Sequence, residues 1–203
     1  MPARSSPRRA KRKTYHHGAL RETLVATALE LLDAGGREAV TVREAARRAG
    51  VSPGAPFRHF PDREALLAAL TSAIGQEFRA FSDQAIERAG ANPLRQFRAM
   101  GLAYIRYAIA HPRRFQLLHA ETCADPKALA LFTRDAEAVA LIARAQREGL
   151  LRPGPPEAVH LAAQALTYGL ARMIVDGHLP RDGAEALAQA VLDVFGRGIA
   201  AAS

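Results

Sequence analysis

The chain has a single cysteine, Cys123, among its 203 residues, so it cannot form a disulfide bond within itself. It also lacks an uninterrupted apolar stretch of about 18 residues, the length that a membrane-spanning helix requires. No apolar run follows the basic N-terminus, which argues against a secretory signal. Together these absences predict a soluble cytoplasmic protein with no membrane partner.

The sequence also lacks the usual signatures of catalysis and of metal binding. Its histidines show no ligand spacing with cysteine or acidic residues, and the adjacent His16 and His17 point apart on a helix. A Gly-rich phosphate loop and a Gly-x-Ser-x-Gly nucleophile motif are both missing. We therefore expect no enzyme activity, no cofactor and no metal site.

Alternating strand patterns are scarce, and alanine and leucine dominate a composition that is 49% hydrophobic. This composition predicts an all-α protein and argues against a disordered chain. Start and stop signals divide the chain into about nine helices, with approximate ranges 19–33, 42–49, 53–60, 63–89, 93–111, 113–121, 126–149, 157–176 and 182–200.

Positive charge is concentrated in the first third of the chain. Residues 1–63 contain 13 Lys or Arg and 6 Asp or Glu, a net charge of +7, whereas residues 64–203 have a net charge of +1. A basic segment attached to a nearly neutral one predicts a polyanionic partner. Nucleic acid and an acidic membrane are both candidates, although the basic tail lacks the apolar anchors of a membrane-binding segment.

Residues 41–60, TVREAARRAGVSPGAPFRHF, contain two short predicted helices around a turn. Thr41 and Glu44 have the spacing of a capping box for the first helix, and Gly50 permits the positive φ of the turn. The Ser-Pro pair that follows starts the second helix. This pattern predicts a helix-turn-helix, whose second helix enters the major groove of DNA.

The stretch TVREAARRAGVSPGAPFRHFPDREALLAAL resembles the DNA-binding domain of the TetR family of bacterial transcriptional regulators. The AGVS turn, the aromatic pair ending in Phe60 and the charged start of the next helix carry this resemblance, which extends from about Tyr15 to Leu70. YHHGALRETL and GLAYIRYAIAHPRRFQLL are similar to a subgroup with a Trp-His-Gly motif in its C-terminal domain; residues 167–169 read Thr-Tyr-Gly here. The resemblance implies a dimeric regulator that typically represses genes and releases DNA when a small molecule binds.

On this basis we expect a disordered basic arm at residues 1–14, a helix-turn-helix domain at 15–62 and a ligand-binding and dimerisation domain at 63–203. The residues placed where family members approach DNA are Thr41, Arg43, Ser52, Gly54, Ala55, Phe57, Arg58, His59 and Arg63. The arm adds Arg8, Arg9, Lys11, Arg12 and Lys13.

Several of these contacts have two interpretations. Arg58 suits either a guanine edge or a phosphate, and Phe57 suits a thymine methyl group, a sugar or a packing role. The arm either lies along the minor groove or is only a solvated tail. Pro56 lacks an amide proton, which predicts an irregular first turn in the second helix.

The last two helices are the predicted dimer interface, since their small and apolar side chains suit a four-helix bundle formed with a second subunit; packing within one subunit is the alternative. The interface residues are Leu161, Ala165, Tyr168, Gly169, Arg172, Leu187, Val191, Val194 and Phe195. A ligand cavity is expected among Phe78, Met100, Tyr104, Tyr107, Phe115, His119 and Cys123, although most of the apolar and aromatic residues in this set also suit the core. Cys123 is either a thiol sensor or a buried inert cysteine.

The sequence therefore predicts a sequence-specific DNA-binding regulator, a homodimer that a small-molecule effector releases from an inverted-repeat operator. The alternative is a non-specific architectural DNA-binding protein. The nearly neutral segment of about 140 residues argues against that alternative, because DNA packaging requires no such domain.

Overall fold

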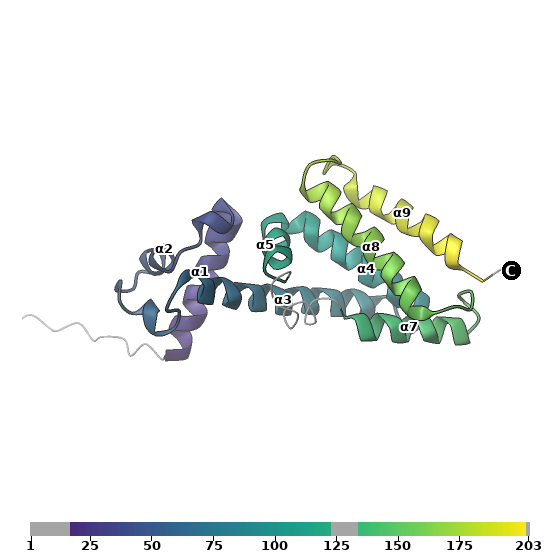
Figure 1. The fold of residues 1–203 in the computed structure, drawn as a ribbon, viewed down its shortest axis with the longest axis horizontal. Helices are drawn as coiled ribbons and strands as arrows, with labels where there is room; N and C mark the ends of the chain where they lie inside the picture. Colours follow the sequence, from purple (N-terminus) through teal and green to yellow (C-terminus); the bar gives the residue numbers. More distant parts are fainter. Residues whose placement is uncertain (1–16, 123–133, 202–203) are drawn as a thin grey trace, which may run out of the picture.

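The computed structural model describes residues 17–122 and 134–201. Within these ranges the chain forms eight α-helices and two 3-10 helices, which confirms the predicted all-α class (Figure 1). The α-helices are α1 His17–Gly35, α2 Val42–Arg48, α3 Arg63–Arg88, α4 Pro93–Ala110, α5 Pro112–Thr122, α7 Asp135–Arg147, α8 Pro156–Val175 and α9 Ala184–Ile199. The 3-10 helices are η1 Arg37–Ala39 and η2 Pro56–Arg58.

Side-chain caps set the starts of three helices. Thr41, Asp62 and Asn92 are the N-caps of α2, α3 and α4, and each accepts a hydrogen bond from the amide three residues later, at 3.1, 2.8 and 3.0 Å. The Glu44 carboxylate accepts hydrogen bonds from Arg47, at 2.8 and 2.6 Å, instead of returning to the Thr41 amide. Only one half of the predicted capping box is therefore formed.

The second helix of the predicted helix-turn-helix differs from the prediction. An α-helix was expected over residues 53–60, but the structure has a turn followed by the three-residue helix η2. Pro56 has no amide to donate to the Ser52 carbonyl, which accepts a shorter-range bond from the Ala55 amide at 3.1 Å. The irregular turn expected at Pro56 is confirmed, and the prediction of an α-helix over residues 53–60 is wrong.

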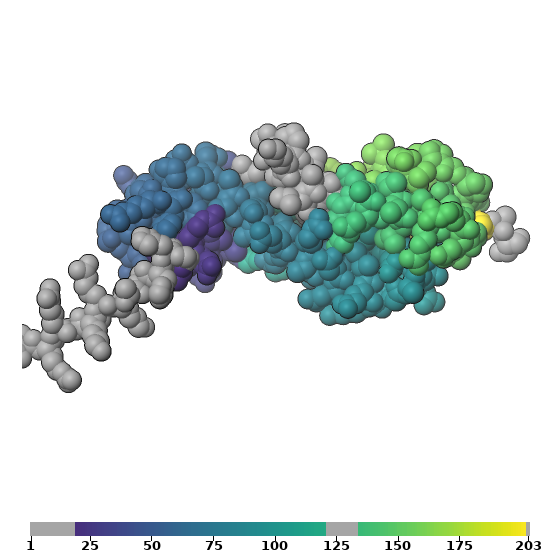
Figure 2. Space-filling model, turned by 90° about the horizontal axis from the view of Figure 1, so that it is seen from below, coloured from purple at the N-terminus to yellow at the C-terminus, as the bar shows by residue number. Residues whose placement is uncertain are grey.

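The molecule is elongated, with two unequal ends. We call residues 17–62, which include α1 and α2, the head, and residues 63–201 as described the body. Helix α3 has 26 residues and so spans about 39 Å, and it runs from the head beneath the body (Figure 1). Figure 2 shows the same arrangement from below, with the head and the body at opposite ends.

One hydrophobic core continues from the head into the body. Leu32 and Phe60 of the head pack in the same cluster as Leu70 and Phe78 of α3 and Leu117 of α5. A second cluster joins α4, α5, α8 and α9. Since α5 contributes to both clusters, its position affects the packing of both ends of the molecule.

Candidate DNA interface and effector cavity

The exposed surface of the head is built from α2, the turn and η2. Most of the residues predicted to contact DNA are exposed there: Thr41, Arg43, Ser52, Gly54, Phe57 and Arg58, with Ala55 and His59 half-buried. Within the described part of the chain, neither Arg43 nor Arg58 has an acidic side chain within 4.0 Å. Their charges are therefore available to an external anion.

The two phenylalanines of this surface have opposite environments. Phe60 is buried beneath Arg21, whose guanidinium lies 5.4 Å from the ring centre. Phe57 is 42% exposed, so much of its ring faces solvent. Arg48 in the last turn of α2 is also exposed, although the sequence analysis did not select it. The feature of the sequence that indicates Arg48 is its place as the second arginine of EAARR, at the end of α2.

Arg63 has a different environment from the other predicted DNA contacts. Its guanidinium donates to the carbonyl oxygens of Val40 and Arg37, at 2.9 and 2.7 Å, and lies 3.3 Å from the Glu38 carboxylate. These bonds tie the first turn of α3 to η1 inside the head. Arg8, Arg9, Lys11, Arg12 and Lys13 lie outside the described residues.

A cavity of about 690 Å³ lies in the body between α4, α8 and α9, with α3, α5 and α7 contributing to its walls. Residues Leu94, Phe97, Gly101 and Tyr104 line it from one face of α4, at successive spacings of three or four residues. This face extends over about 15 Å of the helix. The other apolar lining residues include Phe78, Met100, Ala138, Leu161, Leu192, Phe195 and Ile199.

The structure brings only part of the predicted ligand set together. Phe78, Met100, Tyr104 and His119 line the cavity. Tyr107 and Phe115 were expected to line it and do not: the buried Tyr107 ring packs against Phe78 and Phe81 of α3, and the buried Phe115 ring packs against Tyr104 of α4. Cys123 lies outside the described residues. Four residues predicted for the dimer interface also line the cavity: Leu161, Ala165, Tyr168 and Phe195.

One end of the cavity has uncharged polar groups. The Tyr104 hydroxyl and the His119 Nε2 atom are 2.8 Å apart, and the Tyr168 ring centre is 4.9 Å from that of His119. Burial lowers the pKa of His119 to about 4, and the positive charge of Arg172 acts in the same direction. Burial also raises the pKa of the Tyr104 hydroxyl. Both groups are therefore neutral at pH 7.

Most charged side chains around the cavity are paired with one another, whereas the lining residue Arg197 is exposed and has no acidic side chain within 4.0 Å among the described residues. Arg98 binds Asp193 at 2.7 and 3.0 Å, and His160 lies 2.9 Å from Asp135. Arg134 contacts the carboxylates of Asp83 and Glu137. Neither Arg98 nor Arg134 was predicted from the sequence. Asp193 is 95 residues from Arg98 and Asp83 is 51 residues from Arg134, although Glu137 is only three residues from Arg134.

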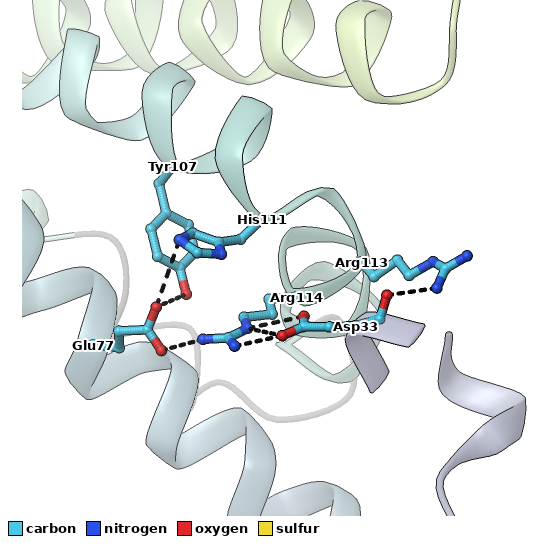
Figure 3. A network of polar contacts seen from close by, with 6 residues as sticks. All are labelled: Asp33, Glu77, Tyr107, His111, Arg113 and Arg114. Atoms are coloured by element: carbon cyan, nitrogen blue, oxygen red, sulfur yellow. Dashed lines mark hydrogen bonds and ion pairs between the residues drawn. The ribbon is translucent and has the colours of Figure 1, made fainter. Parts of the chain in front are cut away.

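A network of charged groups joins the head to the body (Figure 3). Arg114 of α5 donates to the Asp33 carboxylate at the end of α1 and, from Nη1, to Glu77 of α3 at 2.5 Å. The Arg114 side chain is only 17% exposed, and the hydrogen bond to Asp33 raises its pKa. Arg113 donates to the Asp33 carbonyl at 2.6 Å. We call the contacts among Asp33, Glu77 and Arg114 the latch.

Two residues of α4 extend this network. The Tyr107 hydroxyl donates to Glu77 at 3.3 Å, and His111 Nε2 lies 3.9 Å from the same carboxylate. The latch was not predicted from the sequence, although HPRRF carries a signal for it. Two arginines in the first turn of a helix oppose the helix dipole, which favours acidic partners elsewhere in the fold.

The outer face of α8 and α9 exposes large apolar side chains. Leu161 and Val194 are each 64% exposed, and Tyr168, Met173 and Leu187 are also exposed. Gly169, Arg172, Val191 and Phe195 are half-buried at the edges of this face, and Arg172 pairs with Asp176 at 2.8 Å. Exposed apolar groups in such a cluster are typical of a protein-binding surface.

Among the described helices, α8 is the one whose length and apolar composition would allow it to cross a membrane. Helices of soluble proteins pass the same test, and α8 packs against α4 and α7. In residues 17–122 and 134–201, no three His, Cys, Asp or Glu side chains are grouped so that they can hold a metal ion.

Comparison with protein families finds matches in both parts of the chain. Residues 24–70 match the family described as "Bacterial regulatory proteins, tetR family". Residues 97–195 match the family described as "Tetracyclin repressor-like, C-terminal domain". The two matches cover most of the head and most of the body.

The tetracycline repressor protein class C of Escherichia coli is 46% identical to the chain over 54 residues, which are 27% of this chain and 25% of that protein. The chain thus matches about a quarter of the length of this curated relative. A structure of a protein with unknown function from Rhodococcus sp. RHA1 is 32% identical, with a TM-score of 0.81, covering 93% of this chain and 100% of that one. A putative TetR-family transcriptional regulator from Rhodococcus sp. shares the fold, with 22% identity and a TM-score of 0.68, covering 87% and 98%.

Proposed function

The chain belongs to the TetR family of bacterial transcriptional regulators, and we propose that it is a repressor released from its operator by a small-molecule effector. Membership makes it a DNA-binding regulator and implies a non-enzymatic role. Because a bacterial regulator binds DNA inside the cell, we place it in the cytoplasm. The repression and the effector response are supported by the arrangement of three regions.

The cationic surface of the head is the proposed DNA contact. Arg43, exposed on α2, suits a phosphate, and Arg58 on η2 suits a guanine edge or a phosphate. Phe57 is exposed and suits a thymine methyl group or a sugar. The basic arm at residues 1–14 would extend the contact along the minor groove.

The apolar face of α8 and α9 is the proposed homodimer interface. Leu161 and Val194 are more than half exposed, which is unfavourable unless another surface covers them. Pairing of two copies through α8 and α9 would bury both residues in a four-helix bundle. A twofold dimer requires an operator with two inverted half-sites about one helical turn apart.

Helix α5 connects the proposed effector site to the head, and this observation carries the proposal. His119 of α5 lines the cavity, and Arg114, five residues earlier on the same helix, binds Asp33 of α1. A ligand that displaces His119 would therefore move the group that holds α1. Since α1 packs against α2, such a movement changes the spacing of the two heads in a dimer.

Operator selection from random duplex DNA, using the full chain, tests the proposal. We expect enrichment of an inverted repeat with half-site centres about one helical turn apart. Binding of that sequence should exceed binding of a scrambled control by at least about 1000-fold. Equal competition by the scrambled DNA would support the architectural alternative and overturn the repressor proposal.

A further inference from the structure

The cavity is elongated, and its two ends can be placed along α4. Its α4 lining runs from Leu94 to Tyr104, about 15 Å of helix. Arg106, near the end of α4, binds Glu185 in the first turn of α9 at 2.6 Å. Ile199, in the last turn of α9, packs against the same hydrophobic cluster as Leu94. Helices α4 and α9 are therefore antiparallel, and the last turn of α9 lies at the Leu94 end of the cavity.

The two ends of the cavity differ in charge. At the Tyr104 end, burial keeps His119 uncharged at pH 7, because it lowers the pKa of the ring to about 4. At the Leu94 end, Arg197 in the last turn of α9 lines the cavity and is exposed, so it lies where the cavity opens to solvent. Among the described residues, no acidic side chain lies within 4.0 Å of Arg197.

The acid that suits Arg197 best by position is engaged elsewhere. Asp193 precedes Arg197 by four residues on α9, a spacing that allows an ion pair on one helix face. Its carboxylate instead accepts hydrogen bonds from Arg98 of α4 at 2.7 and 3.0 Å. The lining residue Arg134 is also paired, with two carboxylates. Arg197 is therefore the lining cation, within the described residues, whose charge no acid offsets.

A second arginine adds positive charge at the same end. The free carbonyl groups of a helix C-terminus carry partial negative charge, which opposes the binding of an anion. At the end of α9 the Arg152 amide donates to the Ile199 carbonyl at 3.0 Å, and Arg152 Nε donates to the Ala200 carbonyl at 2.9 Å. Since Ala200 lines the cavity, these bonds hold a guanidinium close to the opening and offset the helix dipole there.

We infer that the cavity binds an elongated apolar carboxylate, with its head group at Arg197 and its apolar chain extending toward Tyr104. A carboxylate matches the single charge and the planar geometry of a guanidinium. The walls between the two ends, including Phe97 and Leu192, are mainly apolar and would bury the chain. The role of this ligand as effector rests on the proposed function, but its binding can be measured without DNA.

Displacement of a neutral fluorescent probe, N-phenyl-1-naphthylamine, from the full chain at pH 7.5 measures the charge preference. We expect decanoate to displace the probe at a concentration at least about tenfold lower than decylammonium, which has the same chain and the opposite charge. Raising sodium chloride from about 20 to about 500 mM should weaken decanoate relative to 1-decanol, because salt screens exposed charges. Equal affinities for the two ions, or tighter binding of decylammonium, overturn the inference.

Substitution of Arg197 tests the head-group contact. Arg197→Gln should weaken decanoate by about threefold to tenfold and leave 1-decanol unchanged. Arg197→Glu should reverse the preference, so that decylammonium binds more tightly than decanoate. Arg181→Glu makes the same change of charge at an exposed site before α9, outside the lining, and should preserve the preference for decanoate. The inference fails if the two glutamate variants behave alike, or if Arg197→Glu weakens decanoate and 1-decanol equally.

A second pair of variants tests the position of the apolar chain. Gly196→Leu adds a side chain at a lining position with open space around it and should weaken decanoate and 1-decanol alike. Gly198→Leu, two residues away on the same helix and outside the lining, should weaken neither. Equal decanoate affinity in these two variants would place the chain outside the cavity and overturn the inference.

The outcomes separate this inference from the proposed function. Release of selected operator DNA by decanoate is measured separately from displacement of the probe. Displacement that depends on Arg197, without release of DNA, would leave the ligand chemistry standing and overturn the effector role. Release of DNA by decanoate that is unchanged in Arg197→Glu would instead overturn the assigned head-group contact.

Discussion

The head and the body differ in where they place charged and apolar side chains. In the head, Leu32 and Phe60 are buried, while Arg43 and Arg58 are exposed. In the body, α8 and α9 expose apolar side chains such as Leu161 on their outer face, and the interior contains a cavity. Excess surface cations suit a polyanion, and an exposed apolar face suits a protein. The two ends therefore suit different classes of partner.

Because the two ends suit different partners, the contacts that join the head to the body determine whether binding at one end can affect the other. The hydrophobic cluster that includes Phe60 and Leu117 is continuous across the predicted domain boundary at residue 62. The latch adds a directional ionic contact through Arg114, which is mostly buried. A rigid, densely packed connection transmits displacement better than a flexible linker does. Each of the following experiments alters one of these regions and leaves the others unchanged.

The largest effect is expected at the apolar face of the body. Leu161→Asp combined with Val194→Asp places four carboxylates in a twofold interface, where they would lose hydration without gaining partners. The dimer dissociation constant should rise by at least about 1000-fold. Sedimentation equilibrium measures it, and Ala186→Asp on the exposed surface of α9 offers a single-charge comparison. A double variant that remains dimeric would place the interface elsewhere.

The cationic surface of the head should give the next largest effect. Arg43→Ala with Arg58→Ala removes two groups that we assign to DNA, and operator affinity should fall by about 100-fold. Arg95→Ala with Arg147→Ala removes the same charge from exposed sites of the body and is the control. Fluorescence anisotropy with labelled operator measures both. Equal losses in the two double variants would show that net charge alone determines the affinity.

The latch should have a moderate effect on stability and a larger one on coupling. Arg114→Met removes the cation but keeps a long side chain, and the unfolding free energy should fall by about 2 kcal/mol, because both acids are partly solvated. Effector binding should persist while effector-induced DNA release is lost. Arg114→Lys, which keeps the charge, should retain part of the coupling. If the Arg114→Met variant still released DNA fully when effector was added, the latch would be excluded from the coupling between effector site and head.

The smallest effect is a pH dependence that belongs to the body. His119 has a pKa of about 4 in the folded protein, below the ordinary value of 6.5, so the unfolded chain binds its proton first. Neutral His119 therefore contributes fully to the free energy of unfolding above pH 6.5, and this contribution is lost as the pH falls toward 4. Over this range the free energy of unfolding should change by up to about 1 kcal/mol per pH unit. Urea unfolding of the wild type and of His119→Gln should differ in this slope, and parallel curves would contradict the assignment.

Local patterns predicted most of the fold. Helices α2, α3 and α4 begin directly after Thr41, Asp62 and Asn92, because these side chains cap amides three residues away, a relation that is visible in the sequence. The exception is η2, where Pro56 lacks the amide that an α-helix over residues 53–60 would need.

The candidate sites were less predictable than the fold. Tyr104 and Tyr107 are both aromatic residues of α4, yet one lines the cavity and the other is packed in the core. Three residues correspond to almost one helical turn, and the neighbouring helices decide which of two nearby positions meets open space. Periodicity in one helix does not contain that information.

By itself, the amino-acid sequence determined the all-α class, the basic front of the chain and the apolar stripes of its last two helices, because composition, caps and spacing act over a few residues. The tertiary structure alone decided where the cavity lies and that Arg114 binds Asp33 and Glu77. These features depend on contacts between residues 37 to 81 positions apart, which form only when whole helices pack.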